Sequence, residues 1–108
     1  VPSVWREPFG RTALEAHAGG CAVISSGSGG LAEVSGGHAV MLPEVTAAAL
    51  GDAMSTLIDD GETRARLAKN GRAYVVASFG IEVVSQRLFA FCDSVGRDRE
   101  SVSRQMRA

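Results

Sequence analysis

The sequence predicts an α/β fold that is part of a Rossmann-like domain: half of a doubly wound parallel sheet with about three strands, followed by a helical C-terminal region. Two short apolar runs, at residues 21–25 and 38–42, have the composition of strands buried on both faces. Helical patterns alternate with these runs, which favours parallel strands joined by right-handed crossovers. Residues 1–3 resemble the tail of a further strand, whose edge would lie open.

The expected helices follow from capping residues and from apolar spacing. The first begins at Arg11, and Gly19 and Gly20 end it. Thr46 is a candidate N-cap for a later helix. The other helical segments are expected at residues 31–34, 47–58, 62–78 and from residue 81 onward, where the arginine-rich end either continues the helix or frays.

The length indicates one small domain spanning residues 1–108. Its net charge of −1 gives no electrostatic attraction to nucleic acid, so nucleic-acid binding is not expected. No uninterrupted apolar run approaches the roughly 20 residues of a membrane span, and membrane association is not indicated. Cys21 and Cys92 lie among apolar neighbours, which predicts buried thiols in a reducing compartment. We expect a cytoplasmic location, with the periphery of the inner membrane as the alternative for the full-length protein. The chain opens at Val1 without a methionine, as if it were cut from a longer protein, so we expect an incomplete domain.

The chemistry-bearing stretch runs from Glu7 to Glu15. Its loop follows a strand end and leads into a helix, the place where doubly wound folds bind ligands. Amides near Gly10 and Arg11 would form a cradle for a phosphate or a diphosphate. Eight positions separate the two glutamates, which places their carboxylates roughly 10 Å apart. That distance is too long for a shared proton and suits hydroxyl groups on either side of a diphosphate.

Four motifs in register carry a resemblance to a known family: residues 7–10, Glu15 with Ala16, residues 20–24 and residues 29–33. Together they resemble the retaining glycosyltransferases with two Rossmann domains (GT-B), group 1, family 4. The resemblance implies transfer of a sugar from a nucleotide-diphosphate sugar of the UDP or GDP type, with no metal and no cofactor. It also implies that this chain is the C-terminal part of the donor-binding domain. The acceptor-binding domain, and an arginine and a lysine that neutralise the diphosphate, would lie upstream.

The resemblance also implies roles for individual residues. Glu7 would be the catalytic residue and would bind hydroxyls of the transferred sugar. Glu15 would hold the ribose diol of the nucleotide. The remaining donor-binding residues would be Phe9, Gly10 and Arg11, near the sugar and distal phosphate, and Gly29 and Gly30, which border the nucleotide pocket. By itself such a fragment would be inactive, since the upstream residues supply much of the positioning and charge stabilisation.

Plainer interpretations remain open beside these roles. Without the motif, Glu15 is a solvated surface charge, and Glu33 a capping or pairing residue. His17 and His38 are expected to be structural, with His17 partly buried and hydrogen-bonded. A second hypothesis is a non-catalytic interaction module that forms homodimers through the open sheet edge or by helix swapping. A dinucleotide-binding oxidoreductase is disfavoured because the glycine fingerprint and its downstream acid are absent.

Overall fold

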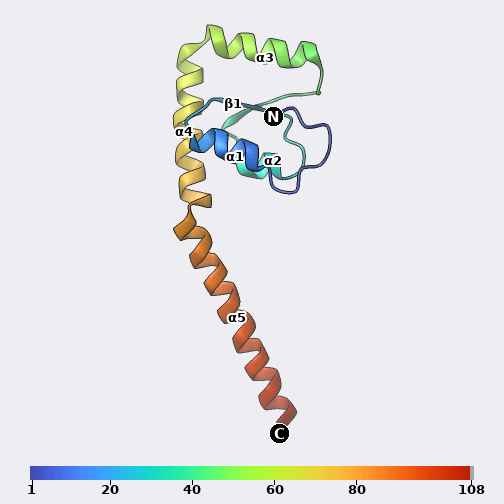
Figure 1. Ribbon diagram of the computed structural model, residues 1–108, viewed down its shortest axis with the longest axis vertical. Coiled ribbons are helices and arrows are strands. Elements are labelled where there is room, and N and C mark those ends of the chain that lie inside the picture. Colours follow the sequence, from blue (N-terminus) through green and yellow to red (C-terminus); the bar gives the residue numbers. More distant parts are fainter. Residues whose placement is uncertain (108) are drawn as a thin grey trace. The chain divides into compact units, whose positions relative to one another are not determined.

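A computed structural model describes residues 1–107. The chain divides into two units, Val1–Ala77 and Ser78–Ala108. The first unit holds the small α/β part of the molecule, and the second is a single long helix (Figure 1). The α/β class expected from the sequence is therefore confirmed for the first unit.

The first unit contains a two-stranded parallel sheet with helices before, between and after its strands. Val23 pairs with Ala39 and Ser25 with Met41, and the helix α2 connects the two strands. The elements in chain order are α1 (Arg11–Ala18), β1 (Val23–Ser25), α2 (Gly30–Ser35), β2 (Ala39–Met41), α3 (Ala47–Asp59) and α4 (Gly61–Phe79). Both expected apolar runs form strands, each shorter than its run.

The expected third strand at residues 1–3 does not form, so the described sheet has two strands rather than about three. Only Val1 lies beside β1: its ammonium group donates to the Ile24 carbonyl at 2.6 Å, and its carbonyl accepts from the Ser26 amide at 3.1 Å. Pro2 has no N–H to continue the pairing. The chain bends away at Val4, and a single paired residue does not make a ladder.

The core of the first unit is small, and its helices and strands all contribute to it or directly flank it. Its buried apolar side chains are Ala13, Val23, Leu31, Val34, Leu42, Leu57 and Val75. Gly10, in the loop before α1, allows the backbone of that loop to pack directly against Leu31 of the core. A Cβ there would lie 2.8 Å from Leu31 Cδ2, and its φ of 92° is the left-handed conformation that glycine tolerates. The packing of α1 against α2 therefore depends on this residue.

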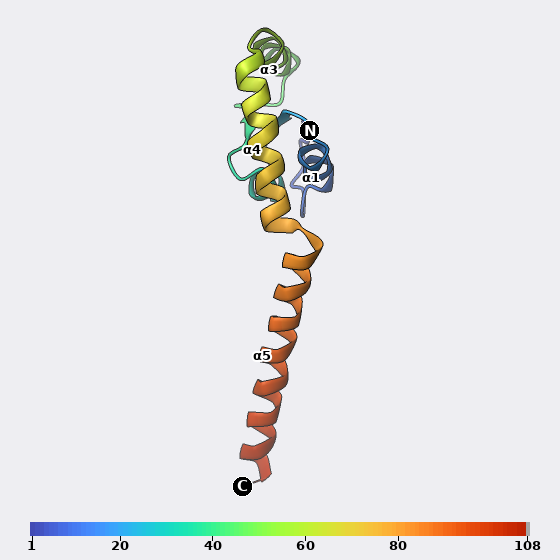
Figure 2. The same ribbon diagram turned by 90° about the vertical axis from the view of Figure 1, so that its left-hand side faces the viewer.

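The helix α4 packs against α1, and Figure 2 shows it in front of the rest of the first unit. Gly71 sits directly on the ring of His17, and Arg72 donates to the Ala18 carbonyl at the end of α1. Tyr74 reaches α2, where its hydroxyl donates to the Glu33 carbonyl at 2.8 Å. The contacts of α4 thus join the two helices that flank the candidate site.

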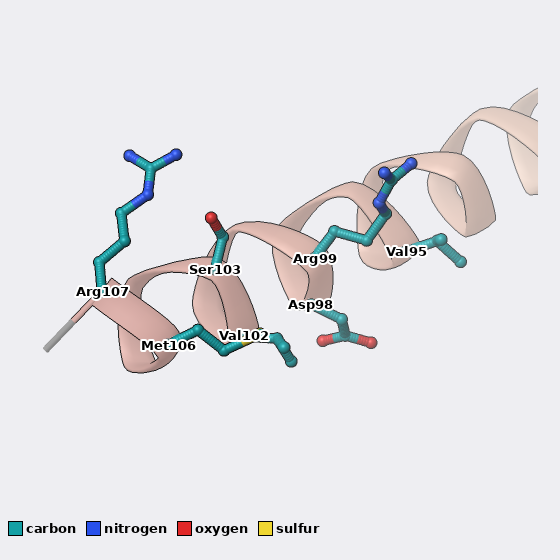
Figure 3. Close-up of a pocket in the computed structure, with 7 residues that line it drawn as sticks. All are labelled: Val95, Asp98, Arg99, Val102, Ser103, Met106 and Arg107. Carbon is teal, nitrogen blue, oxygen red and sulfur yellow. The ribbon is translucent and has the colours of Figure 1, made fainter.

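The second unit begins with the last residues of α4 and consists mainly of the helix α5 (Ile81–Arg107), none of whose side chains is buried. The arginine-rich end continues the helix. Apolar side chains three or four residues apart are exposed at Ile81, Val84, Leu88, Phe91 and Val95, and again at Val102 and Met106. Near the C-terminal end Val102 and Met106 lie together, while Arg99 and Arg107 point away from them (Figure 3). This amphipathic pattern leaves an apolar stripe without a partner within the described part of α5.

One composition-based expectation is wrong, and one further finding concerns membrane spans. Cys21 and Cys92 are exposed rather than buried, because Cys21 precedes β1 and Cys92 lies on the uncovered helix. Among the described residues, Gly61–Arg107 contains an 18-residue window that is long and apolar enough to cross a membrane by length and composition, and only 6% of it is buried. The sequence expectation concerned uninterrupted apolar runs, whereas this window includes isolated charges, and the absence of membrane association stays a prediction.

Candidate functional site

The loop that carries Glu7 is fastened to the glycine-rich loop before α2. Glu7 and Gly29 form an isolated parallel bridge, and the Gly30 amide donates to the Glu7 carbonyl at 2.7 Å. The carboxylate of Glu7 is also held, since the Ser3 hydroxyl donates to its Oε1 at 2.9 Å. Backbone and side chain of Glu7 are therefore both positioned by neighbours.

The close contact between the Glu7 loop and the loop before α2 requires glycine at positions 29 and 30. A Cβ on Gly29 would lie 2.3 Å from the Glu7 carbonyl oxygen, and one on Gly30 would lie 2.6 Å from that of Phe9. Gly29 also has a φ of 60°. Any larger residue would push the two loops apart, so the glycines fix how closely the Glu7 loop approaches α2.

A polar cleft of about 390 Å³ opens where the two loops meet. We call it the Glu7 cleft, and it is lined by Arg6, Glu7, Pro8, Gly29, Gly30 and Glu33. It brings together three of the residues expected from the sequence: Glu7, Gly29 and Gly30. Arg6 was not among the expected site residues, and Glu33 was expected to cap or pair. Two signals could have found them, since Arg6 directly precedes Glu7 and Glu33 lies one turn after Gly30.

Arg11 and Glu15 stand outside the Glu7 cleft, on the exposed face of α1. Arg11 Nε donates to Glu15 Oε1 at 2.9 Å, and the two side chains are 85% and 65% exposed. Such an i,i+4 surface pair contributes well under about 1 kcal/mol, so a ligand can displace it at small cost. The solvated surface charge proposed as the plain interpretation of Glu15 matches this geometry, with Arg11 as its partner.

The N-terminus of α1 follows the Glu7 loop in the chain and precedes the Arg11–Glu15 pair. Its N-cap is Gly10, which has no side chain to accept from the first amides, so no side-chain cap bonds to them. Phe9, just before it, is 45% exposed. Uncapped amides at a helix N-terminus carry partial positive charge that favours an anion.

His17 lies on the inward face of α1 and is completely buried. Neither of its ring nitrogens has a hydrogen-bond partner among the described residues, so the expected hydrogen-bonded, partly buried histidine is wrong on both points. Burial lowers the pKa of His17, and the nearby His38 lowers it further. The ring is therefore a neutral packing element between α1 and Gly71 of α4.

Within residues 1–107, no three or more histidine, cysteine, aspartate or glutamate side chains are grouped so that they could hold a metal ion. The Glu7 cleft instead offers carboxylate acceptors, one guanidinium and a glycine floor. This combination can hydrogen-bond hydroxyl groups and can accept a group of negative charge beside Arg6.

Comparison with known proteins supports a family assignment. The model of a family described as glycosyl transferases group 1 matches residues 1–74, a range that includes every site residue named above. The D-inositol 3-phosphate glycosyltransferase of Corynebacterium glutamicum (strain R) is 40% identical over 72 residues, which is 65% of this chain and 17% of that protein. The chain thus spans about a sixth of the length of this curated relative. No solved structure matches the chain. Since the family match covers well over half of its residues, the chain belongs to the group 1 glycosyl transferases.

Proposed function

We propose that this chain supplies part of the donor site of a retaining glycosyltransferase, which moves a sugar from a nucleotide-diphosphate sugar to an acceptor. The observation that carries the proposal is the Glu7 cleft: Glu7, Gly29 and Gly30 meet there, within the region matched by the family. The relative from Corynebacterium glutamicum is named as a glycosyltransferase acting on D-inositol 3-phosphate. A phosphorylated polyol is accordingly a reasonable acceptor class to test first.

In this proposal Glu7 binds hydroxyl groups of the transferred sugar. An ionised carboxylate accepts several hydrogen bonds, and a sugar ring presents adjacent hydroxyl donors. Ser3 occupies one position on Oε1 and limits the rotation of the carboxylate. A carboxylate held in this way positions the sugar without paying to order its own side chain at each turnover.

The donor's diphosphate would lie at the N-terminus of α1, beside Phe9, Gly10 and Arg11. The uncapped amides there favour the charge that develops on the leaving nucleoside diphosphate. Glu15 would accept the ribose hydroxyls after parting from Arg11, and Arg11 would then be available to the phosphates. The scheme uses neither a metal ion nor a cofactor, and the nucleotide is of the UDP or GDP type.

The proposal also places the chain in a larger protein. The two strands and their helices would be the C-terminal portion of a Rossmann-like donor domain in a GT-B enzyme. The remaining sheet, further cationic residues and the acceptor-binding domain would come from upstream. We propose a cytoplasmic location, where the exposed thiols of Cys21 and Cys92 would stay reduced.

A titration of the ¹⁵N-labelled chain tests the donor site. UDP, GDP, UDP-glucose and GDP-mannose are added to the wild type, to Glu7→Gln and to Glu44→Gln. We expect shifts of the amide signals of residues 7–15 and 29–30, and a loss of affinity for the sugar nucleotide of about tenfold in Glu7→Gln. Glu44 is exposed and lies outside the Glu7 cleft, so its variant should bind as the wild type does. Equal affinities in all three proteins would remove the role given to Glu7.

A second candidate function is self-association as an interaction module. The exposed apolar stripe of α5 favours it, because side chains such as Leu88 and Phe91 are more than half exposed. Two copies could bury these stripes against each other. Sedimentation equilibrium of the wild type and of Leu88→Gln measures the association, and a purely monomeric wild type at high concentration would exclude this function.

A further inference from the structure

Arg6 is the cation of the Glu7 cleft. Its side-chain stem lies over Gly29: a Cβ on that glycine would be 2.9 Å from Arg6 Cγ. The glycine therefore gives the stem a flat backbone surface to lie on, and Arg6 lines the cleft beside Glu7. A long side chain that rests its stem on backbone can present its head group to a ligand in the cleft.

The charged side chains of the Glu7 cleft form no ion pairs with one another in the described part of the chain. Among residues 1–107 the ion pair is Arg11–Glu15, outside the cleft, so Arg6 forms no ion pair with Glu7 or Glu33. Glu33 is held through its backbone, where Tyr74 donates to its carbonyl, and this leaves its carboxylate free of that contact. Glu7 accepts from the neutral Ser3 hydroxyl. Arg6, Glu7 and Glu33 thus line a single cleft without an ion pair between them.

This arrangement selects for a particular ligand chemistry. Two carboxylates repel a bare anion and accept hydrogen bonds from hydroxyl groups. A guanidinium presents five N–H donors in a planar fork that matches the oxygens of a phosphate. A ligand satisfies all three side chains when it carries several hydroxyl groups and one phosphate.

We propose that Arg6 is a specificity-determining residue of the Glu7 cleft and recognises a phosphate on a hydroxyl-rich ligand. The inference rests on the proposed function for the identity of that ligand as a glycosyltransferase substrate. The phosphate has two sources, the diphosphate of the donor or a phosphate ester on a sugar or polyol acceptor. In both cases Arg6 binds the anion while Glu7 and Glu33 accept from the hydroxyls.

The test is a titration of the ¹⁵N-labelled chain with four probes: glucose, glucose 1-phosphate, UDP and inorganic phosphate. Arg6→Met removes the charge and keeps a stem, Arg6→Lys keeps the charge without the planar fork, and Arg66→Met removes an exposed arginine of α4 outside the cleft. For glucose 1-phosphate we expect an affinity loss of about tenfold in Arg6→Met and a smaller loss in Arg6→Lys. Arg66→Met should be unchanged. Glucose should bind equally weakly to all four proteins.

The probes separate the two sources of phosphate. An Arg6-dependent loss for UDP assigns the residue to the donor diphosphate, and a loss confined to glucose 1-phosphate assigns it to a phosphate ester beside a sugar ring. Thermal unfolding of Arg6→Met should match the wild type, because an exposed side chain without an ion pair contributes little to stability.

The inference is overturned if no phosphate probe shows an Arg6-dependent change in affinity, or if Arg66→Met loses as much as Arg6→Met. Its failure is distinguishable from failure of the proposed function. Shifts with sugar nucleotides that depend on Glu7 but not on Arg6 would reject the inference alone. Glucose 1-phosphate binding that depends on Arg6, without any response to sugar nucleotides, would reject the donor site alone.

Discussion

Replacing Gly71 by alanine tests how α4 is seated on α1. The new Cβ would lie 2.3 Å from Nδ1 and 2.9 Å from Cε1 of His17, both far inside ordinary contact distance. The ring is fully buried, and a close-packed interior leaves a side chain little room to shift. The helices must therefore separate or the ring must leave its preferred rotamer.

The magnitude follows from two opposing effects. Alanine is favoured over glycine in a helix interior by about 1 kcal/mol. Overpacking a well-packed site costs typically about 1–3 kcal/mol, and a contact this short belongs at the upper end. We therefore expect Gly71→Ala to lower the free energy of unfolding by about 2 kcal/mol.

Gly51→Ala is the matched control. Gly51 lies inside α3, and a Cβ there would meet nothing within 4 Å. The same substitution should therefore raise the free energy of unfolding by up to about 1 kcal/mol. Urea unfolding followed by circular dichroism measures both variants beside the wild type. If Gly71→Ala proved as stabilising as Gly51→Ala, the close seating of α4 on His17 would be refuted.

Two further predictions concern stability. The pKa of buried His17 is lowered, so the unfolded chain takes up a proton first as the pH falls; the free energy of unfolding should decline below about pH 6.5, the ordinary histidine value, and continue to decline until the folded protein also protonates. Urea midpoints measured across this range should fall for the wild type more steeply than for His17→Gln, and parallel curves would contradict the assignment. Thr46 caps α3, since its hydroxyl accepts from the Ala49 amide at 3.1 Å, and Thr46→Ala should cost about 1 kcal/mol while Thr46→Ser costs little. Equal losses in the two variants would show that the hydroxyl is not the stabilising group.

The elements of this protein follow closely from local sequence. The apolar runs at residues 21–25 and 38–42 contain β1 and β2, Gly19 and Gly20 follow the end of α1, and Thr46 caps α3 as expected. Capping, glycine stops and apolar spacing act over a few residues, so a single sequence carries the information. The family motifs are equally local, and they pointed to the group that the comparison then showed.

Which residues line the candidate site depends on contacts between segments that are distant in the sequence. The bridge between Glu7 and Gly29 creates the Glu7 cleft, and it brings Arg6 and Glu33 into the site while leaving Arg11 and Glu15 paired outside it. The same kind of contact seats Gly71 on His17 and limits the first strand to one paired residue. Sequence by itself determined the α/β class, the helix ends and the family, because these follow from short-range patterns. Tertiary structure alone decided which charged residues line the Glu7 cleft. That depends on how closely the Glu7 loop approaches the loop that contains Gly29 and Gly30.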